Sequence, residues 1–249
     1  TQAKTLFPYT TLFRSVILTG TIVGIVPENQ AVKRSGAQEG DIVFVTGTLG
    51  DSSAGLSILL DGKKEEYPML AIRHQRPKPQ IDFGRILRES GASSLNDVSD
   101  GLSREINEIA LASRVTIELE KERIPLSDEL CRWGQDCGKE PFHFAINGGE
   151  DYELVGTISK KNWEYVLFRL LEPFGFTSSV VADLASVLKS DGTVSGRTFV
   201  ADEYLAVTSA REIVISPVAE LAEATDLTIN GPGTYSLNGI KFSVSLSDD

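Results

Sequence analysis

The chain has 249 residues, of which 41% are hydrophobic and 24% are charged, the composition of an ordinary globular protein. Its 24 basic and 35 acidic residues give a formal net charge of −11, which argues against nucleic acid or an anionic membrane surface as the partner. The longest apolar run, 16–26, is interrupted by Thr and Gly and falls short of the ~20 apolar residues that a membrane helix needs. Cys131 and Cys137 match no zinc spacing and no disulfide framework, so we expect a cytoplasmic protein.

Residues 1–15, TQAKTLFPYTTLFRS, contain no signal-peptide pattern and resemble translated sequencing adapter. We treat them as a leader outside the fold. Residues 16–26 are rich in Val, Ile and Thr and predict a strand. A second strand is predicted at 42–46, followed by the glycine-containing segment 47–50 and a helix at 51–60. A strand, a glycine loop and a helix start can bind an anion, but no Lys-Ser/Thr pair follows the last glycine, and tight packing is the favoured interpretation.

The segment 73–79, Arg-His-Gln-Arg-Pro-Lys-Pro, is predicted to be extended because each Pro biases the preceding residue away from helix. His74 lies in this segment and is predicted to be a surface residue rather than part of a site. A short helix is predicted at 83–89.

The segment 94–112 holds the most informative pattern of the chain. Apolar residues at three- and four-residue spacing predict one face of a helix that begins at Leu102. Asp97 and Asp100 flank Ser99 just before this helix. Either Ser99 or Asp100 caps the helix start, or the two carboxylates bind a Mg²⁺ ion together with substrate phosphates. Two carboxylates ~4 Å apart repel by about 4 kcal/mol at an effective dielectric constant near 20, a conflict that a cation removes.

The remaining elements follow from periodicity. Alternation of apolar and polar residues predicts a half-buried strand at 115–119 and continues at 142–146. A strand is also predicted at 152–158, after the glycine turn, and another at 176–181. Ser127 is predicted to cap a helix, and an apolar stripe predicts a helix at 159–171. In the C-terminal part, Ser216-Pro217 predicts the start of a short helix, and 236–244 predicts a hairpin around Asn238-Gly239.

Four motifs occur in a fixed order: Arg-Ser-Gly-Ala-Gln-Glu-Gly-Asp at 34–41, Gly-Thr-Leu-Gly-Asp-Ser-Ser-Ala-Gly-Leu at 47–56, Asp-Val-Ser-Asp-Gly-Leu at 97–102 and Gly-Gly-Glu-Asp-Tyr-Glu-Leu at 148–154. Together they resemble the C-terminal part of the thiamine-monophosphate kinase family, within the aminoimidazole ribonucleotide synthetase superfamily. The resemblance extends from about residue 16 to about residue 183.

The resemblance implies transfer of the γ-phosphate of ATP to the phosphate of thiamine monophosphate, which makes thiamine diphosphate. It assigns Asp97 and Asp100 to Mg²⁺, Ser99 and Arg34 to the nucleotide, and Glu150 to the thiamine moiety. No side chain is assigned as a catalytic base, because the acceptor is already an anion. Without the family, Arg34 is an ordinary surface turn residue and Glu150 merely flanks a turn.

The resemblance also predicts the fold class, an α/β (α+β) domain with helices packed on a mainly antiparallel or mixed sheet, over residues 16–185. Residues 186–249 are expected to be a divergent acidic tail. The family's N-terminal half, which supplies further aspartates and a dimer interface, is missing from this chain, so we expect little activity from the chain alone. The alternatives are another superfamily activity, aminoimidazole ribonucleotide or selenophosphate synthesis, and a truncated domain without catalysis.

Overall fold

The computed structural model describes residues 21, 23–189, 196–208, 213–218, 233–237 and 240–244. The chain divides into two units, Thr1–Ala31 and Val32–Asp249. The described part of the first unit contains one turn, in which the Gln30 N–H donates to the Pro27 carbonyl at 3.1 Å, and no helix or strand. The leader predicted at 1–15 lies outside the described residues.

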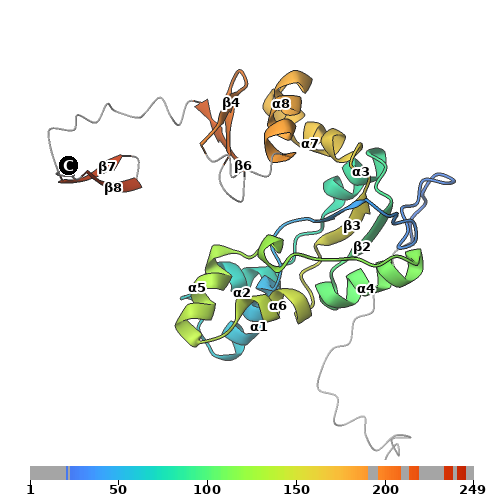
Figure 1. Cartoon of the computed structure of the whole chain (residues 1–249). Helices are drawn as coiled ribbons and strands as arrows, with labels where there is room; N and C mark the ends of the chain where they lie inside the picture. Colours follow the sequence, from blue (N-terminus) through green and yellow to red (C-terminus); the bar gives the residue numbers. More distant parts are fainter. Residues whose placement is uncertain are drawn as a thin grey trace, which may run out of the picture. The chain divides into compact units, whose positions relative to one another are not determined.

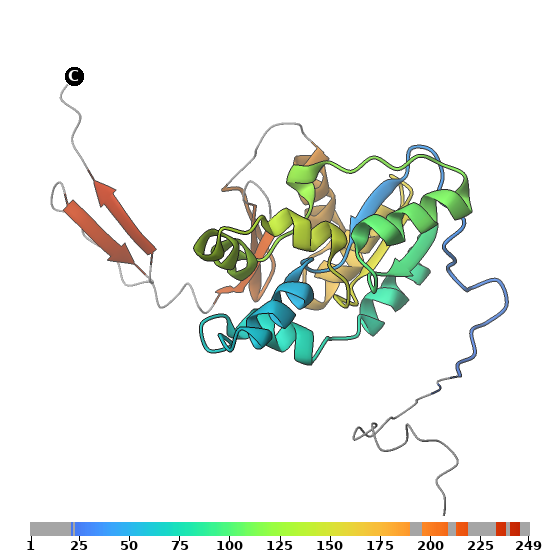
Figure 2. The same cartoon turned by 90° about the horizontal axis from the view of Figure 1, so that it is seen from below.

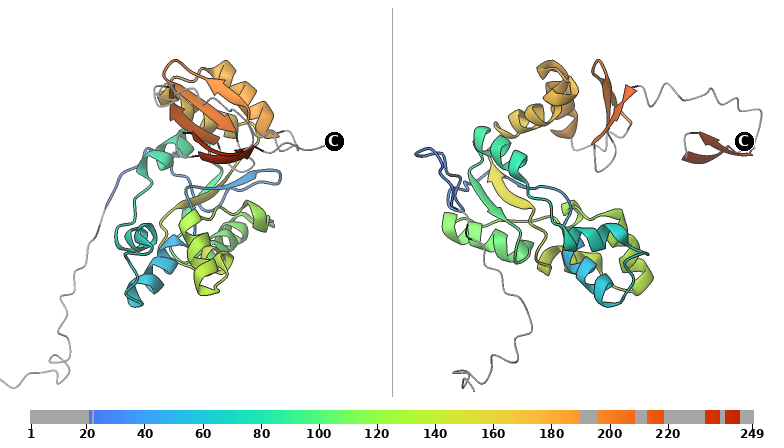
Figure 3. Two further views of the ribbon diagram at one scale, coloured as in Figure 1. Left: turned by 90° about the vertical axis from the view of Figure 1, so that its left-hand side faces the viewer. Right: turned by 180° about the vertical axis from the view of Figure 1, so that it is seen from behind.

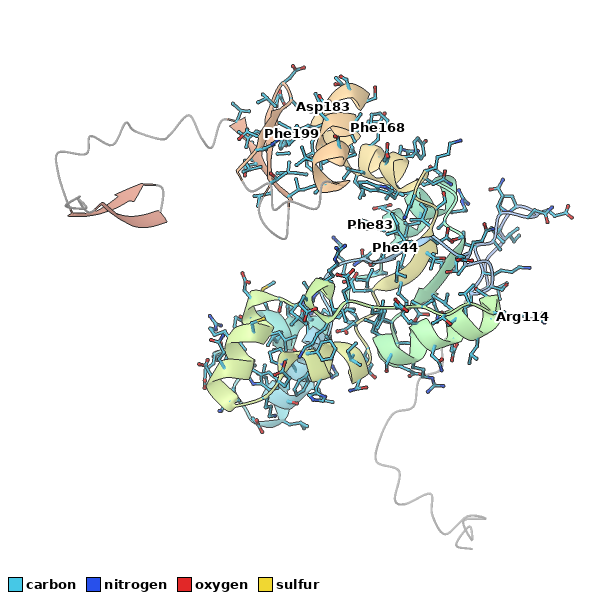
Figure 4. The ribbon with its side chains drawn as sticks, viewed as in Figure 1. Phe44, Phe83, Arg114, Phe168, Asp183 and Phe199 are labelled. Carbon is cyan, nitrogen blue, oxygen red and sulfur yellow. The ribbon has the colours of Figure 1, made fainter. Side chains whose placement is uncertain are left out.

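A three-stranded antiparallel sheet forms the first core of the second unit. It consists of β1 (Ile42–Val45), β2 (Ser94–Asp97) and β3 (Leu154–Ile158), in the order β1-β3-β2. Gly156 of the central strand has no side chain, which leaves room for the Ser94 carbonyl and for the Phe44 ring labelled in Figure 4. The register places Asp97 opposite Leu154, so the last residue of β2 lies beside the first residue of β3.

Six helices accompany this sheet, and Figures 1 and 3 show α3 and α4 on either side of it. They are α1 (Asp51–Leu60), α2 (Pro68–Gln75), α3 (Ile81–Glu89), α4 (Leu102–Ser113), α5 (Asp128–Cys137) and α6 (Pro141–Asn147), with a 3-10 turn at Lys121–Arg123. Helix α4 packs on the sheet through Leu102, Ile106 and Ile109. A second apolar cluster joins α1, α2 and α5 around Trp133, which is 1% exposed.

A further set of elements has its own apolar cluster. Helix α7 (Trp163–Leu171), a 3-10 turn (Glu172–Phe174) and α8 (Ser178–Lys189) precede β4 (Thr198–Val200), β5 (Tyr204–Thr208) and β6 (Ile213–Pro217), which pair in the order β4-β5-β6. Phe168 and Phe199, labelled in Figure 4, pack against its buried residues. The cluster contains no residue of the first two clusters.

Two polar contacts join these elements to α3 and to the turn that follows it. Arg169 pairs with Glu89 at 3.1 Å, and the Asn162 amide donates to the Gly91 carbonyl at 3.5 Å. Both pairs are exposed, and exposed pairs contribute little to stability. We therefore describe residues 163–217 as the second module and residues 32–158 as the first module.

The strands β7 (Gly233–Leu237) and β8 (Ile240–Val244) pair antiparallel, with Leu237 opposite Ile240, and Figure 2 shows them as a red ribbon. The hairpin predicted at 236–244 is therefore confirmed in its pairing. Its turn, Asn238-Gly239, lies outside the described residues.

The predicted fold class, a mixed α+β domain, is confirmed. The helices predicted at 51–60, from 102 and at 83–89 are present, as are the strands at 42–46 and 152–158 within a few residues. The Ser127 hydroxyl accepts from the Leu130 N–H at 3.1 Å and caps α5 as predicted. The helix predicted at 159–171 begins at Trp163.

Several predicted elements are wrong. The alternation at 142–146 belongs to helix α6, which Pro141 opens at its first turn, and the strand predicted at 176–181 is instead the start of α8. Short apolar runs do not distinguish strand from helix. Ser216 and Pro217 end strand β6 rather than starting a helix.

Two further predictions fail because a strand needs a partner. Residues 115–119 show alternating exposure, with Val115 and Ile117 packed on the first cluster, but form no strand. Residues 23–26 are exposed and also form no strand, while 16–20 lie outside the described part. The segment predicted to be extended at 73–79 is helical up to Gln75, so the Pro residues end α2 only after His74.

Across the ranges that the structure describes, no helix has the length and apolar character needed to cross a lipid bilayer.

We expect the two modules to unfold separately. Leu184 is 0% exposed in the second module. The substitution Leu184→Ala should lower the unfolding free energy of that module by about 2–5 kcal/mol, because it leaves a cavity. Hydrogen exchange read by mass spectrometry should then accelerate in residues 163–217 and stay unchanged in β1–β3. The matched variant is Ile109→Ala, 0% exposed in the first module, with the reverse pattern. Equal acceleration in both modules with either variant would contradict separate unfolding.

Candidate functional site

The turn between β2 and α4 carries the predicted metal and nucleotide residues. Gly101 is the N-cap of α4, with φ at 103°, and no side chain caps the helix. The interpretation that Ser99 or Asp100 caps this helix is therefore wrong. Instead the carboxylate of Glu105 reaches back from the first turn and accepts from the Asp100 N–H at 3.3 Å. The side chains of Ser99 and Asp100 are left available for another role.

Asp97 and Asp100 differ in their surroundings. Asp100 is 55% exposed and pairs with Arg104 at 3.1 Å, one helical turn away. Asp97 is exposed at the end of β2 and, among the described residues, has no ion-pair partner. Burial raises the pKa of the neighbouring Glu105 carboxyl, and the negative charges of Glu108 and Asp97 add to this effect. The turn is therefore a site of unbalanced negative charge, which a cation would relieve.

Two carboxylates fit the donor set of a nucleotide-bound Mg²⁺, which is typically held by one or two carboxylates, waters and phosphates. They do not make a cage for a metal alone. Across the described ranges, no three His, Cys, Asp or Glu side chains are grouped closely enough to hold an ion.

Arg34 lies beside the same strand end. Its Nε donates to the Asn96 side-chain oxygen at 3.0 Å, and its Nη1 pairs with Glu108 at 2.6 Å. Asn96 in turn donates to Glu105. The Arg34 carbonyl accepts from Ser113 at the end of α4 at 3.2 Å, which holds the backbone of this segment against that helix. The Arg34 side chain is 53% exposed, so it remains open to solvent although its Nε and Nη1 are in contact with Asn96 and Glu108.

Glu150 lies on the other side of the turn. Its backbone, with φ at 65°, donates to the Ser99 carbonyl at 2.8 Å. A side chain on Gly149 would come within 2.5 Å of that same carbonyl, so the glycine allows the two loops to pack. The Glu150 side chain is 61% exposed. The structure thus brings Glu150 beside Ser99 although fifty residues separate them in the sequence.

The two acidic residues that follow Glu150 have a different role that the sequence analysis missed. Asp151 accepts from the N–H groups of Gly50 and Ser52 at 2.7 and 3.0 Å. It therefore caps the start of α1 from a distant loop and occupies donors that an anion would need. The tight packing favoured for 47–50 is confirmed, because a side chain on Gly50 would lie 2.6 Å from the Ala145 nitrogen.

Glu153 is 1% exposed and accepts from the Thr46 hydroxyl at 2.6 Å. Its other oxygen pairs with Arg73 at 3.1 Å. Asp51, also buried, accepts from the hydroxyls of Thr48 and Ser127, at 2.6 Å each. These carboxylates hold β1, α1, α2 and β3 together. A buried pair of this kind is costly to break, because the remaining charge is left without a partner.

His74 was predicted to be a surface residue, but it is partly buried. Its side chain is 19% exposed, and its Nδ1 lies 3.0 Å from the Ser52 hydroxyl and 3.7 Å from a Glu150 oxygen. The sequence did not reveal this burial, because the Pro residues that follow His74 suggested an extended segment. In the structure His74 belongs to α2, which packs against α1. The sequence alone offered no indication of this contact.

Comparison with known proteins gives two family matches. Residues 38–161 match the C-terminal domain of the AIR synthase related proteins. Residues 157–218 match the TilS substrate binding domain, a range that contains the second module.

Curated relatives include the thiamine-monophosphate kinases of Bacillus subtilis, 42% identical over 154 residues, and of Aquifex aeolicus, 44% identical over 148 residues. These matches cover 60% and 58% of this chain, and 46% and 48% of the relatives. The chain thus spans about half the length of the curated relatives it matches.

Two solved structures are similar to the chain. AaThiL complexed with AMPPCP and TMP is 45% identical with a TM-score of 0.51, and the match covers 53% of this chain and 43% of that one. Thiamine-monophosphate kinase from Stenotrophomonas maltophilia is 33% identical with a TM-score of 0.54, covering 60% and 48%.

The titration of Asp151 should be visible in the stability of the protein. Burial raises its pKa from 3.8 to about 6, so the folded chain binds this proton more tightly than the unfolded chain. The stability that the proton contributes is present below about pH 4 and is lost as the pH rises through about 6. Asp151→Asn removes the titration, so the difference in unfolding free energy between the two proteins should change by on the order of 1–3 kcal/mol across that window.

Urea denaturation at several pH values between 4 and 7 measures this difference. Asp82→Asn, which alters a side chain that is 92% exposed, is the control and should give a curve parallel to that of the unaltered chain. A parallel curve for Asp151→Asn as well would show that Asp151 does not titrate in this range.

Proposed function

We infer that this chain is part of a thiamine-monophosphate kinase, because residues 38–161 match the C-terminal domain of the AIR synthase related proteins. The supporting observation is the meeting of two loops: the Glu150 N–H bonds to the Ser99 carbonyl. This backbone contact supports the proposal, because the proposed acceptor-binding residue and the proposed metal–nucleotide turn are then neighbours in the fold.

The proposed reaction transfers the γ-phosphate of ATP to the phosphate of thiamine monophosphate. The bond between the γ-phosphorus and the bridging oxygen of ATP breaks, and a bond forms from an acceptor phosphate oxygen to that phosphorus. ADP leaves with the bridging oxygen. The acceptor is already an anion, so no side chain has to remove a proton from it. Such transfers depend on positioning and on neutralising charge.

Each predicted residue has a place in this proposal. Asp97 and Asp100 would hold Mg²⁺, which neutralises charge on the phosphates when it is bound. The Ser99 hydroxyl would bond to the nucleotide. Arg34 would contact the phosphates with its exposed side chain, since a guanidinium suits paired phosphate oxygens. Glu150 would face the cationic ring of thiamine.

The setting of the proposal follows from composition and from the relatives. A net charge of −11 disfavours nucleic acid as a partner, and a chain with two cysteines that match no disulfide framework suits a reducing cytoplasm. A homodimer is expected for the whole family. Because the chain spans about half the length of its relatives, we expect it to bind Mg–ATP weakly and to transfer phosphate slowly by itself.

The domain boundary is part of the proposal. The sequence predicted one domain over 16–185 and a divergent tail over 186–249. The match of 157–218 to another family and the separate apolar cluster of the second module both support a boundary near 160. We therefore assign the kinase role to the first module alone.

Calorimetric titration tests the function. The chain should bind the ATP analogue AMPPCP only with Mg²⁺, and Asp97→Asn together with Asp100→Asn should weaken this binding at least about tenfold, because the ion loses both protein ligands. Asp82→Asn, on exposed α3, is the matched control.

Thiamine monophosphate should bind the same chain. Aminoimidazole ribonucleotide binding in its place would support the alternative activity of the superfamily. Absence of binding by both the analogue and thiamine monophosphate would favour a truncated domain without a ligand.

A further inference from the structure

His74 connects the fixed part of the first module to the exposed carboxylate of Glu150. Its ring is mostly buried, at 19% exposure, whereas the Glu150 side chain is 61% exposed. One ring nitrogen, Nδ1, lies 3.0 Å from the Ser52 hydroxyl and 3.7 Å from Glu150. A buried group is thus within reach of an exposed one that carries a proposed binding role.

The position of the ring is fixed from several directions. Gly55 of α1 packs against the Leu70 carbonyl, and a side chain on Gly55 would come within 3.1 Å of the His74 Cβ. Ser52 is 1% exposed and belongs to the first turn of α1, which Asp151 holds by two hydrogen bonds. The imidazole is therefore held by residues that are themselves fixed, and precise placement of a neighbouring group requires this.

Glu150 needs such a support more than the buried carboxylates do. Its backbone is held at Ser99, but its side chain extends toward solvent, and fixing an exposed carboxylate costs conformational entropy. Within the described ranges, His74 is the one side chain that pairs with it. If His74 only stabilised the fold, its hydrogen bond with Ser52 would be enough. Such a role does not explain why the same ring nitrogen also lies 3.7 Å from the Glu150 carboxylate.

We propose that His74 is a positioning residue that holds the Glu150 carboxylate for a cationic aromatic ring of the acceptor. The proposal rests on the proposed function and adds a residue on α2 to the acceptor side of the site. It predicts that His74 affects affinity for the thiamine end of the ligand and leaves affinity for the nucleotide unchanged.

The contact itself can be read without any ligand, because the chain has two histidines. The other, His143, is exposed on α6 and serves as an internal reference. In NMR spectra of the histidine rings, Glu150→Gln should shift the His74 resonances and leave those of His143 in place. Unchanged His74 resonances would overturn the proposal, whatever the chain binds.

The effect on binding is measured by calorimetry with thiamine monophosphate and, separately, with Mg²⁺ and AMPPCP. His74→Ala should weaken the binding of thiamine monophosphate about threefold to tenfold, because the Glu150 carboxylate loses its polar neighbour, and should leave the binding of AMPPCP unchanged. His74→Asn, whose amide nitrogen can stand near the position of Nδ1, should restore most of the affinity. His143→Ala is the control and should bind both ligands normally.

The outcomes separate the two proposals. Normal thiamine monophosphate binding by His74→Ala, or equal losses for both ligands, would overturn the role of His74 while leaving the proposed function in place. If the unaltered chain does not bind thiamine monophosphate, the proposed function is contradicted for this chain, and the positioning role toward that acceptor falls with it. The NMR result then still decides whether His74 and Glu150 are coupled.

Discussion

The candidate site depends on two buried carboxylates, Asp151 at the start of α1 and Glu153 between the end of β1 and α2. Asp151 bonds to the Gly50 and Ser52 N–H groups, and Glu153 is held by Thr46 and Arg73. Both come from the loop that also carries Glu150. Because these anchors lie inside the protein, where an unpaired charge is expensive, the loop has little freedom, and Glu150 is presented to solvent from a fixed backbone. A loop without these anchors would not hold Glu150 beside Ser99.

The same constraint divides neighbouring acidic residues into two kinds. In the segment Glu-Asp-Tyr-Glu at 150–153, the second and fourth residues are structural and the first faces solvent. At the β2–α4 turn, Glu105 is buried and bonds to Asn96, while Asp97 and Asp100 are exposed. Burial thus commits some carboxylates to holding the fold and leaves others exposed to solvent. The negative charge that stays exposed lies at two loops in contact with each other.

The second module has an apolar cluster of its own. This cluster contains no residue of the other two clusters. An exposed ion pair and an exposed hydrogen bond join the module to α3 and to the turn after that helix, and exposed polar contacts of this kind contribute little free energy. The separate cluster agrees with matches to two different families on either side of residue 160. The site is built by the first module without help from the second.

The sequence by itself determined the family resemblance, the class of the fold and the helices with a clear apolar stripe, such as the one that begins at Leu102. Ordered motifs and period 3.6 are local properties, so one chain suffices to read them. It did not determine whether 142–146 or 176–181 is strand or helix, because short apolar runs suit both. Only the tertiary structure decided that Asp151 and Glu153 are anchors and that His74 meets Glu150. Those roles depend on contacts between residues far apart in the chain, and burial and pairing arise only when the chain has folded.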